Sequence, residues 1–194
     1  MTSPGPALRC LLEVLEKLGI SCFAGGSLAS SVHGIPRATR DVDLVADLGP
    51  EHVDALVREL GSEFYADRGM ILDALERARP FNLIHFASAY KFDIFPMRGD
   101  EFAEEEFGRR EIRQVPLLDE SFSLPVASAE DIVLSKLRWF RRGGEISERQ
   151  WADARGVVEA QRDRLDINYL RRWAKKLAVE DLLDRLLAQA GIPN

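Results

Sequence analysis

The stretch G-G-S-L-A-S-S-V-H-G-I-P-R-A-T-R-D-V-D-L at residues 25–44 decides how this chain is organised. A short apolar run, Ser21–Ala24, precedes it and predicts a strand. Two glycines then turn the chain into a short helix that stops near Gly34 and Pro36. Asp41–Ala46, which reads D-V-D-L-V-A, predicts a second strand. This succession of strand, turn, helix and strand indicates a domain that mixes helices with strands.

The hydrophobic period divides the rest of the chain into two parts. In the first part, strands are predicted at 81–86, 90–95, 111–117 and 122–126, and helices at 8–18, 51–60, 70–79 and 101–107. In the second part, helices are predicted at 129–142, 147–160, 167–177 and 179–190. The chain therefore belongs to the α+β class, with a mixed half at 1–126 and a helical bundle at 127–194. We expect the bundle to pack against the sheet and to leave one cleft between the halves.

Charge and composition exclude several classes of protein. The chain has 194 residues, with 26 Lys and Arg against 32 Asp and Glu, so it is not a strongly basic general nucleic-acid binder. Its apolar runs are shorter than the roughly 20 residues that cross a bilayer. The residues thus predict a cytoplasmic protein with no membrane contact, in which Cys10 and Cys22 are small core residues without a disulfide.

The strongest chemical signal is the pair Asp41 and Asp43. Two positions apart on a strand, their carboxylates point to the same face and repel each other unless a cation such as Mg²⁺ lies between them. Solvated acids at the end of a strand are the alternative. Gly25 and Gly26 precede a helix that Ser27 would cap, so free backbone N–H groups face the same region and suit a triphosphate.

A third acid stands in a later strand. Alternation places Asp93 with Lys91 and Phe95 on the face opposite Phe92 and Ile94. A carboxylate in an otherwise apolar strand is costly unless it is paired or bound to a metal. The alternative is a charged residue that protects an edge strand from aggregation.

Together these residues resemble a known signature. Gly-Gly-Ser, a short helix, Asp-x-Asp on a strand and a single Asp on a later strand are similar to the polymerase-β-like nucleotidyltransferase superfamily. Residues 25–45 resemble the branch that contains the abortive-infection nucleotidyltransferase toxins, and A-S-A-E-D-I-V-L-S-K-L at 127–137 resembles its helical half. The resemblance implies a minimal nucleotidyltransferase fold, a mixed β-sheet flanked by helices, followed by the helical bundle.

The resemblance also implies roles for single residues. The catalytic residues would be Asp41, Asp43, Asp93 and Lys136. The first three of these would bind two Mg²⁺ ions, and Asp93 would ligate the second ion or accept a proton from the attacking hydroxyl. The nucleotide-binding residues would be Gly25, Gly26, Ser27, Arg40 and Asp153. The substrate would be an NTP, and Lys136 would neutralise phosphate charge near the three acids.

Several of these residues have simpler interpretations. Arg37 and Arg40 would contact the phosphates or the acceptor substrate. The alternative is that either of them orients the carboxylate of Asp41 or Asp43. His33 fits a cap or a packing role better than catalysis. Lys136 would otherwise belong to a solvated basic face, and Asp153 would pair with Arg149 one turn earlier.

The bundle also carries three tryptophans, Trp139, Trp151 and Trp173, whose positions on its helices favour core packing over base stacking.

The implied reaction is transfer of a nucleoside monophosphate from an NTP to a hydroxyl, with release of pyrophosphate. The toxin branch makes an RNA or tRNA end, or a protein hydroxyl, the leading acceptor, and it implies a cognate antitoxin as partner. A small-molecule acceptor such as an antibiotic is the alternative within the enzyme class. The alternative outside it is a non-catalytic binding module, although three clustered acids would serve no chemical purpose there.

Overall fold

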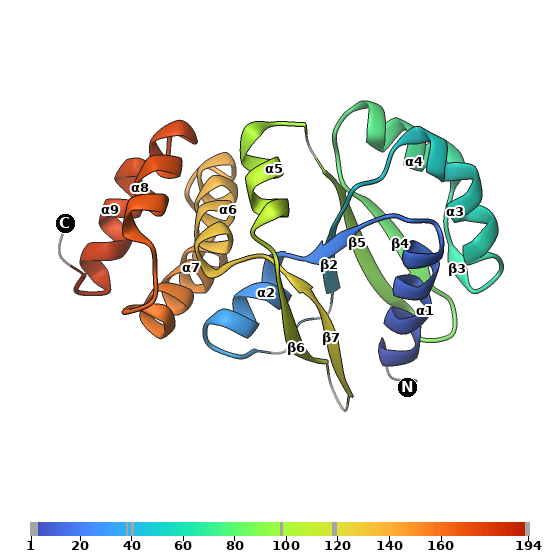
Figure 1. Ribbon diagram of the computed structural model, residues 1–194, viewed down its shortest axis with the longest axis horizontal. Coiled ribbons are helices and arrows are strands. Elements are labelled where there is room, and N and C mark those ends of the chain that lie inside the picture. Colours follow the sequence, from blue (N-terminus) through green and yellow to red (C-terminus); the bar gives the residue numbers. More distant parts are fainter. Residues whose placement is uncertain (1–3, 38, 40, 98, 118–119, 193–194) are drawn as a thin grey trace.

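The computed structural model describes residues 4–37, 39, 41–97, 99–117 and 120–192 (Figure 1). The strands are β1 (Cys22–Ala24), β2 (Asp41–Ala46), β3 (Phe64–Tyr65), β4 (Phe81–His85), β5 (Tyr90–Pro96), β6 (Glu111–Leu117) and β7 (Glu120–Val126). The helices are α1 (Pro4–Lys17), α2 (Gly26–His33), α3 (Val53–Leu60), α4 (Arg68–Glu76), α5 (Glu101–Gly108), α6 (Ala129–Arg142), α7 (Glu148–Gln161), α8 (Ile167–Lys176) and α9 (Glu180–Gln189). A 3₁₀ turn at Pro50–His52 precedes α3.

The strands form one mixed seven-stranded sheet in the order β3-β4-β5-β2-β1-β7-β6. The β2–β5 and β1–β7 pairs are parallel, and the other neighbours are antiparallel. In β2 the buried residues Val42, Leu44 and Ala46 alternate with the partly exposed Asp41 and Asp43. Their apolar face anchors the strand in the core, because a period of two places alternate side chains on opposite faces of a sheet.

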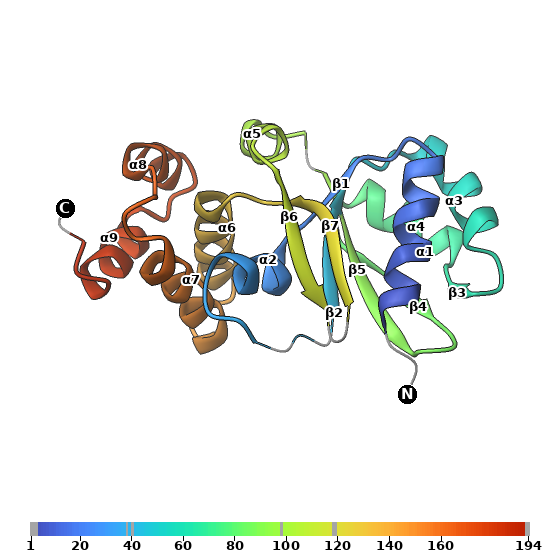
Figure 2. The same ribbon diagram turned by 60° about the horizontal axis from the view of Figure 1, so that its bottom comes forward.

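Helices cover the sheet from two sides. Figures 1 and 2 show α1, α3 and α4 gathered beside the β4 end of the sheet, while α6 to α9 extend away on the opposite side. Helix α2 lies between the sheet and the bundle, in contact with β2, α6 and α7. The short helix that follows the glycine turn thus joins the two halves of the molecule.

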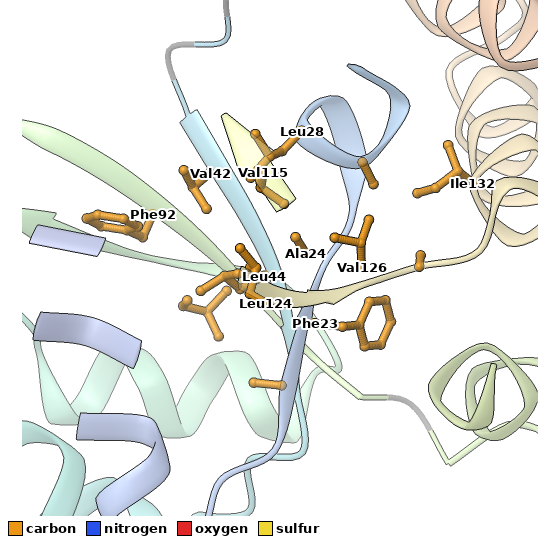
Figure 3. Packing of buried hydrophobic residues seen from close by; sticks show 14 of the residues in the cluster. Phe23, Ala24, Leu28, Val42, Leu44, Phe92, Val115, Leu124, Val126 and Ile132 are labelled. Atoms are coloured by element: carbon orange, nitrogen blue, oxygen red, sulfur yellow. The ribbon is translucent and has the colours of Figure 1, made fainter. Parts of the chain in front are cut away.

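The core runs through this junction. Figure 3 shows its centre, where side chains of the central strands meet Leu28 of α2 and Ile132 of α6. The ring of His33, the last residue of α2, is buried, and its Nε2 lies 2.7 Å from the Ala127 carbonyl oxygen. Burial lowers the pKa of His33, and the contact to Ala127 opposes that effect. His33 therefore has the packing role that its position at the helix end suggests.

A buried polar cluster fastens the bundle to the rest of the chain. Asp131 of α6 is fully buried and accepts hydrogen bonds from the Ser128 and Tyr169 hydroxyls. The Arg109 guanidinium lies 3.3 Å from the same carboxylate and stacks over the Tyr169 ring at 3.9 Å. Each buried polar group is satisfied, so the cluster fixes α6 and α8 relative to the end of α5.

The mixed sheet with flanking helices confirms the predicted α+β class, and the predicted elements match the observed ones except near their ends. The sequence missed β3, since two residues show no period. The description of the tryptophans needs correction: Trp173 is buried, but Trp139 is 43% exposed. Cys10 and Cys22 are free thiols and only partly buried. Among the described residues no helix is long and apolar enough to cross a bilayer.

Candidate active site

A cavity of about 350 Å³ opens where the glycine turn, the sheet and the bundle meet. The turn residues Gly25, Gly26 and Ser27, together with Asp43 of β2 and Lys136 of α6, form one part of its wall. Further along, apolar and aromatic side chains from β5, α5 and α6 complete it. Charged side chains also lie along that part of the wall, including Glu106 and Arg138. The cavity is therefore mixed, with aromatic and charged groups side by side, as in many small-molecule sites.

The three predicted acids share one face of the sheet. The parallel register of β2 and β5 places Asp43 opposite Asp93 and Asp41 opposite Lys91. Because β5 lies between β4 and β2, Asp93 is not on an edge strand, and the interpretation as an edge protector is wrong. Asp93 is instead paired with Lys91, whose Nζ lies 2.9 and 2.7 Å from its two carboxylate oxygens.

Asp43 is tied to the start of α2. The Ser27 backbone N–H donates to Asp43 Oδ2 at 3.1 Å, and the Gly25 N–H donates to the Asp43 carbonyl at 3.0 Å. Gly26 has φ +51°, and a Cβ there would overlap the Asp43 carboxylate. Only glycine therefore fits this approach. The N-cap position of α2 is Gly25, which has no side chain, and Ser27 lies inside the first turn. The carboxylate of Asp43, from β2, therefore supplies the capping acceptor expected of Ser27.

The Asp43 carboxyl has a raised pKa. Burial is the main cause, the charge of Asp93 adds to it, and the hydrogen bond from Ser27 opposes it. The carboxylate is thus held in a place where a further cation would stabilise it.

Ser27 is instead the centre of a cationic cluster. Its hydroxyl accepts hydrogen bonds from Arg37 Nη2 at 2.7 Å and from Arg149 Nη2 at 2.9 Å. Arg37 also makes two hydrogen bonds to Asp153, at 2.9 and 3.0 Å. The expected pair of Asp153 with Arg149 is therefore wrong, because Arg149 turns to Ser27 and Asp153 meets Arg37 from a distant loop. Two guanidinium groups at a helix N-terminus favour bound phosphate.

Lys136 lies inside the molecule, so the interpretation as a solvated basic face is wrong. Its side chain is 5% exposed, and its Nζ donates to Asp153 Oδ2 at 2.8 Å. Burial lowers the pKa of Lys136, while the Asp153 hydrogen bond and the charges of Asp153 and Asp43 oppose that effect. Burial would raise the pKa of Asp153, but the bonds from Arg37 and Lys136 outweigh it and the net pKa is low. Arg40 lies outside the described residues.

Sequence reasoning missed three features of this cavity. Lys91 was placed on the correct face, but no local pattern identified its ion pair with Asp93. Glu106 of α5 lines the cavity and accepts a hydrogen bond from the Ser135 hydroxyl, and burial raises its pKa to about 8. Trp139 lines the cavity beside Phe95, with the two rings edge to face at 6.2 Å. The hydrophobic period of a strand or helix predicts which of its faces is buried. It does not predict which side chains from different elements line the same cavity.

The carboxylates suit a hard divalent cation. Within the described part of the chain, no group of three or more His, Cys, Asp and Glu side chains is already arranged around a metal position. Asp43 and Asp93 nevertheless face each other across neighbouring strands, and the Asp93 charge contributes to the raised pKa of Asp43. A cation between them would relieve this repulsion, and carboxylate oxygens are the ligands that Mg²⁺ prefers. The residues present therefore fit a magnesium ion.

Comparison with known proteins now identifies the chain. A family model described as the nucleotidyl transferase AbiEii toxin of a type IV toxin–antitoxin system matches residues 21–193. The chain belongs to this AbiEii nucleotidyltransferase toxin family. It is accordingly an enzyme, a nucleotidyltransferase, which favours the catalytic hypothesis over the non-catalytic binding module. The family suggested by the glycine turn and the three acids is confirmed.

Solved structures share the fold of this AbiEii family member at low identity. A nucleotidyltransferase-like antigen from Paracoccidioides brasiliensis superposes with a TM-score of 0.52 at 16% identity, covering 94% of this chain and 90% of that one. The antibiotic-resistance factor ANT(2'')-Ia superposes with a TM-score of 0.51 at 11% identity, covering 94% and 91%. A search of curated proteins gave no significant match.

Proposed function

We propose that the enzyme uses Mg²⁺ to transfer a nucleoside monophosphate from an NTP to a hydroxyl of an RNA or tRNA end, or of a protein. The toxin–antitoxin family supports a cognate antitoxin as its partner. The single observation that carries the proposal is the place of Asp43, which joins the glycine turn and the start of α2 to the carboxylate face of the sheet. Phosphate-binding and metal-binding groups thereby meet at one residue.

The cavity offers separate places for the parts of a nucleotide. The turn Gly25–Ser27 and the guanidinium groups of Arg37 and Arg149 would hold the phosphates, and Lys136 would add a positive charge beside them. The rings of Phe95 and Trp139 would take the nucleoside. Two Mg²⁺ ions bound by Asp41, Asp43 and Asp93 would supply charge neutralisation at the α-phosphate and at the leaving oxygen.

The transfer then needs one proton movement that this chain can provide. The acceptor hydroxyl oxygen bonds to the α-phosphorus, and the bond from that phosphorus to the pyrophosphate oxygen breaks. Asp93 would take the proton of the attacking hydroxyl, since it lies beside Asp43 on the face toward the cavity.

Exposed arginines favour a nucleic-acid acceptor over an antibiotic. Arg79 and Arg142 line the cavity and are exposed, and the partly buried Arg138 also lines it, 3.7 Å from Asp100. Such a group of cations at the mouth of a site attracts a phosphate backbone. A neutral or cationic small-molecule acceptor would not be attracted by these arginines. Both kinds of acceptor are included in the following test.

The test is incubation of the protein with each labelled NTP, Mg²⁺ and either total RNA, protein extract or aminoglycosides. We expect label on RNA or protein with release of pyrophosphate, no label in EDTA, and transfer reduced at least about 100-fold by Asp43→Asn. Asp47→Asn is the matched control, because Asp47 follows the same strand but is exposed and is not part of the cavity wall. Unchanged transfer by Asp43→Asn, or equal loss in both variants, would contradict the proposal, and label on aminoglycosides alone would establish the small-molecule alternative.

A further inference from the structure

The ammonium group of Lys91 lies against two of the three acids on the carboxylate face of the sheet. Its Nζ contacts both carboxylate oxygens of Asp93, at 2.9 and 2.7 Å, and lies 3.8 Å from Asp41 Oδ2. The strand register explains this, because Lys91 is directly opposite Asp41 and two residues before Asp93 on the same face. One ammonium group thus contacts two of the three acids that are proposed to bind magnesium.

This arrangement solves an electrostatic problem of the metal-free protein. Carboxylates on adjacent positions of two paired strands destabilise each other when no cation is present. The Lys91 ammonium supplies such a cation from the chain itself, since it contacts both oxygens of Asp93 and lies within 3.8 Å of Asp41. Lys136, the other nearby lysine, is engaged by Asp153.

We propose that Lys91 is a tethered counter-ion that replaces the metal in the free enzyme and competes with it for Asp93. The inference rests on the proposed function, since it takes Asp41, Asp43 and Asp93 as the metal ligands. Both Asp93 oxygens are engaged by Lys91, so a divalent cation bound to Asp93 would lie close to the ammonium and be repelled by it.

Departure of the ammonium is feasible for this side chain. Lys91 is 37% exposed, against 17% for Asp93, and lysine carries its charge at the end of a flexible stem. The ammonium can therefore turn to solvent, or to the phosphates of an NTP in the same cavity. In its bound position it keeps the affinity of the free enzyme for divalent metal low.

The test measures metal binding rather than transfer. Free Mn²⁺ is followed by electron paramagnetic resonance in titrations of the wild type, Lys91→Met and Lys91→Arg, and melting temperatures are recorded in EDTA and in Mn²⁺. Lys17→Met is the matched control, because it removes the same charge from an ion pair between α1 and Glu59 of α3, neither of which lines the cavity. Asp43→Asn shows which part of the signal belongs to the site.

We expect Lys91→Met to bind Mn²⁺ about 3- to 10-fold more tightly than the wild type, as loss of one competing partly exposed cation predicts. The same variant should melt lower in EDTA and regain the wild-type melting temperature in Mn²⁺. Lys91→Arg and Lys17→Met should leave the affinity unchanged.

Mn²⁺ binding that Asp43→Asn abolishes but Lys91→Met leaves equal or weaker would overturn the inference and leave the proposed metal site intact. Absence of site-specific Mn²⁺ binding in every variant would overturn both.

Discussion

Asp43 shows how much a single residue can determine here. Its carboxylate caps the start of α2 through Ser27, and its side chain also faces Asp93 across the sheet. A helix-capping carboxylate contributes about 1 kcal/mol to stability in other proteins. The residue therefore links the local structure of the turn to the electrostatics of the site, and Gly26 is the neighbour that permits the approach.

At this scale we predict that Gly26→Ala displaces the Asp43 carboxylate. A side chain at φ +51° costs about 1–2 kcal/mol in backbone strain, and the new Cβ would also overlap Asp43. We expect a loss of about 2–4 kcal/mol in the free energy of unfolding and about 100-fold in transfer. Chemical denaturation and the transferase assay measure the two effects.

Gly144→Ala is the matched control for this prediction. Gly144 has φ +70° and open space around its Cβ position, so this substitution adds strain without overlap. Equal effects of both alanines on stability and transfer would show that the contact between Gly26 and Asp43 has no role.

At the scale of elements, three segments meet at Asp153, and a fourth is linked to it through Arg37. The carboxylate on α7 binds Lys136 from α6 and Arg37 from the loop after α2, and Arg37 continues to Ser27 in α2. These contacts are mostly buried, so removing one partner leaves charges without compensation. The two helices of the bundle are thus fixed to the helix that begins at the glycine turn.

We predict that Asp153→Asn lowers the free energy of unfolding by about 2–4 kcal/mol, since it leaves the buried Lys136 ammonium without its carboxylate. Denaturant titration measures this loss. Glu159→Gln, on the same helix, breaks an exposed pair with Arg155 and should cost less than about 1 kcal/mol. If the two substitutions cost the same, the internal pairing of Asp153 contributes nothing beyond a surface ion pair.

For the whole molecule, folding stability should depend on pH through Glu106. This carboxyl lies where α5 packs near α6, and burial followed by the Asp131 charge raises its pKa from 4.5 to about 8. Between those values the folded state binds more protons than the unfolded state, so stability falls as pH rises through that interval. The proton held by Glu106 thus stabilises the folded chain at acid pH and is lost near pH 8.

We predict that Glu106→Gln matches the wild type in stability near pH 5 and becomes more stable by on the order of 1–3 kcal/mol near pH 8.5. Denaturant titrations at a series of pH values measure the difference. Glu104→Gln, an exposed position on the same helix, should show no such dependence. A stability difference for Glu106→Gln that does not grow with pH would mean that this carboxyl stays charged in the folded state.

The sequence alone determined the helices and strands other than β3, the α+β class and the face on which Asp41, Asp43 and Asp93 lie. These features could be predicted because they depend on local periodicity. Alternation along a strand and the helical repeat fix which side chains share a face before any tertiary contact forms. Two glycines after a strand also sufficed to place the turn at Gly25–Gly26. The same residues carried the family resemblance that the comparison later confirmed.

Only the tertiary structure decided which charged groups meet. The pair of Arg37 and Asp153 joins residues 116 positions apart, and Lys91 reaches Asp41 through the register of two strands that are far apart in the chain. Glu106 and Trp139 face the cavity because α5 and α6 pack at a particular angle to the sheet. The periodicity of a single element does not predict contacts between residues that are far apart in the chain. The free energy of each ion pair depends on burial and geometry, which only the packing of the elements determines.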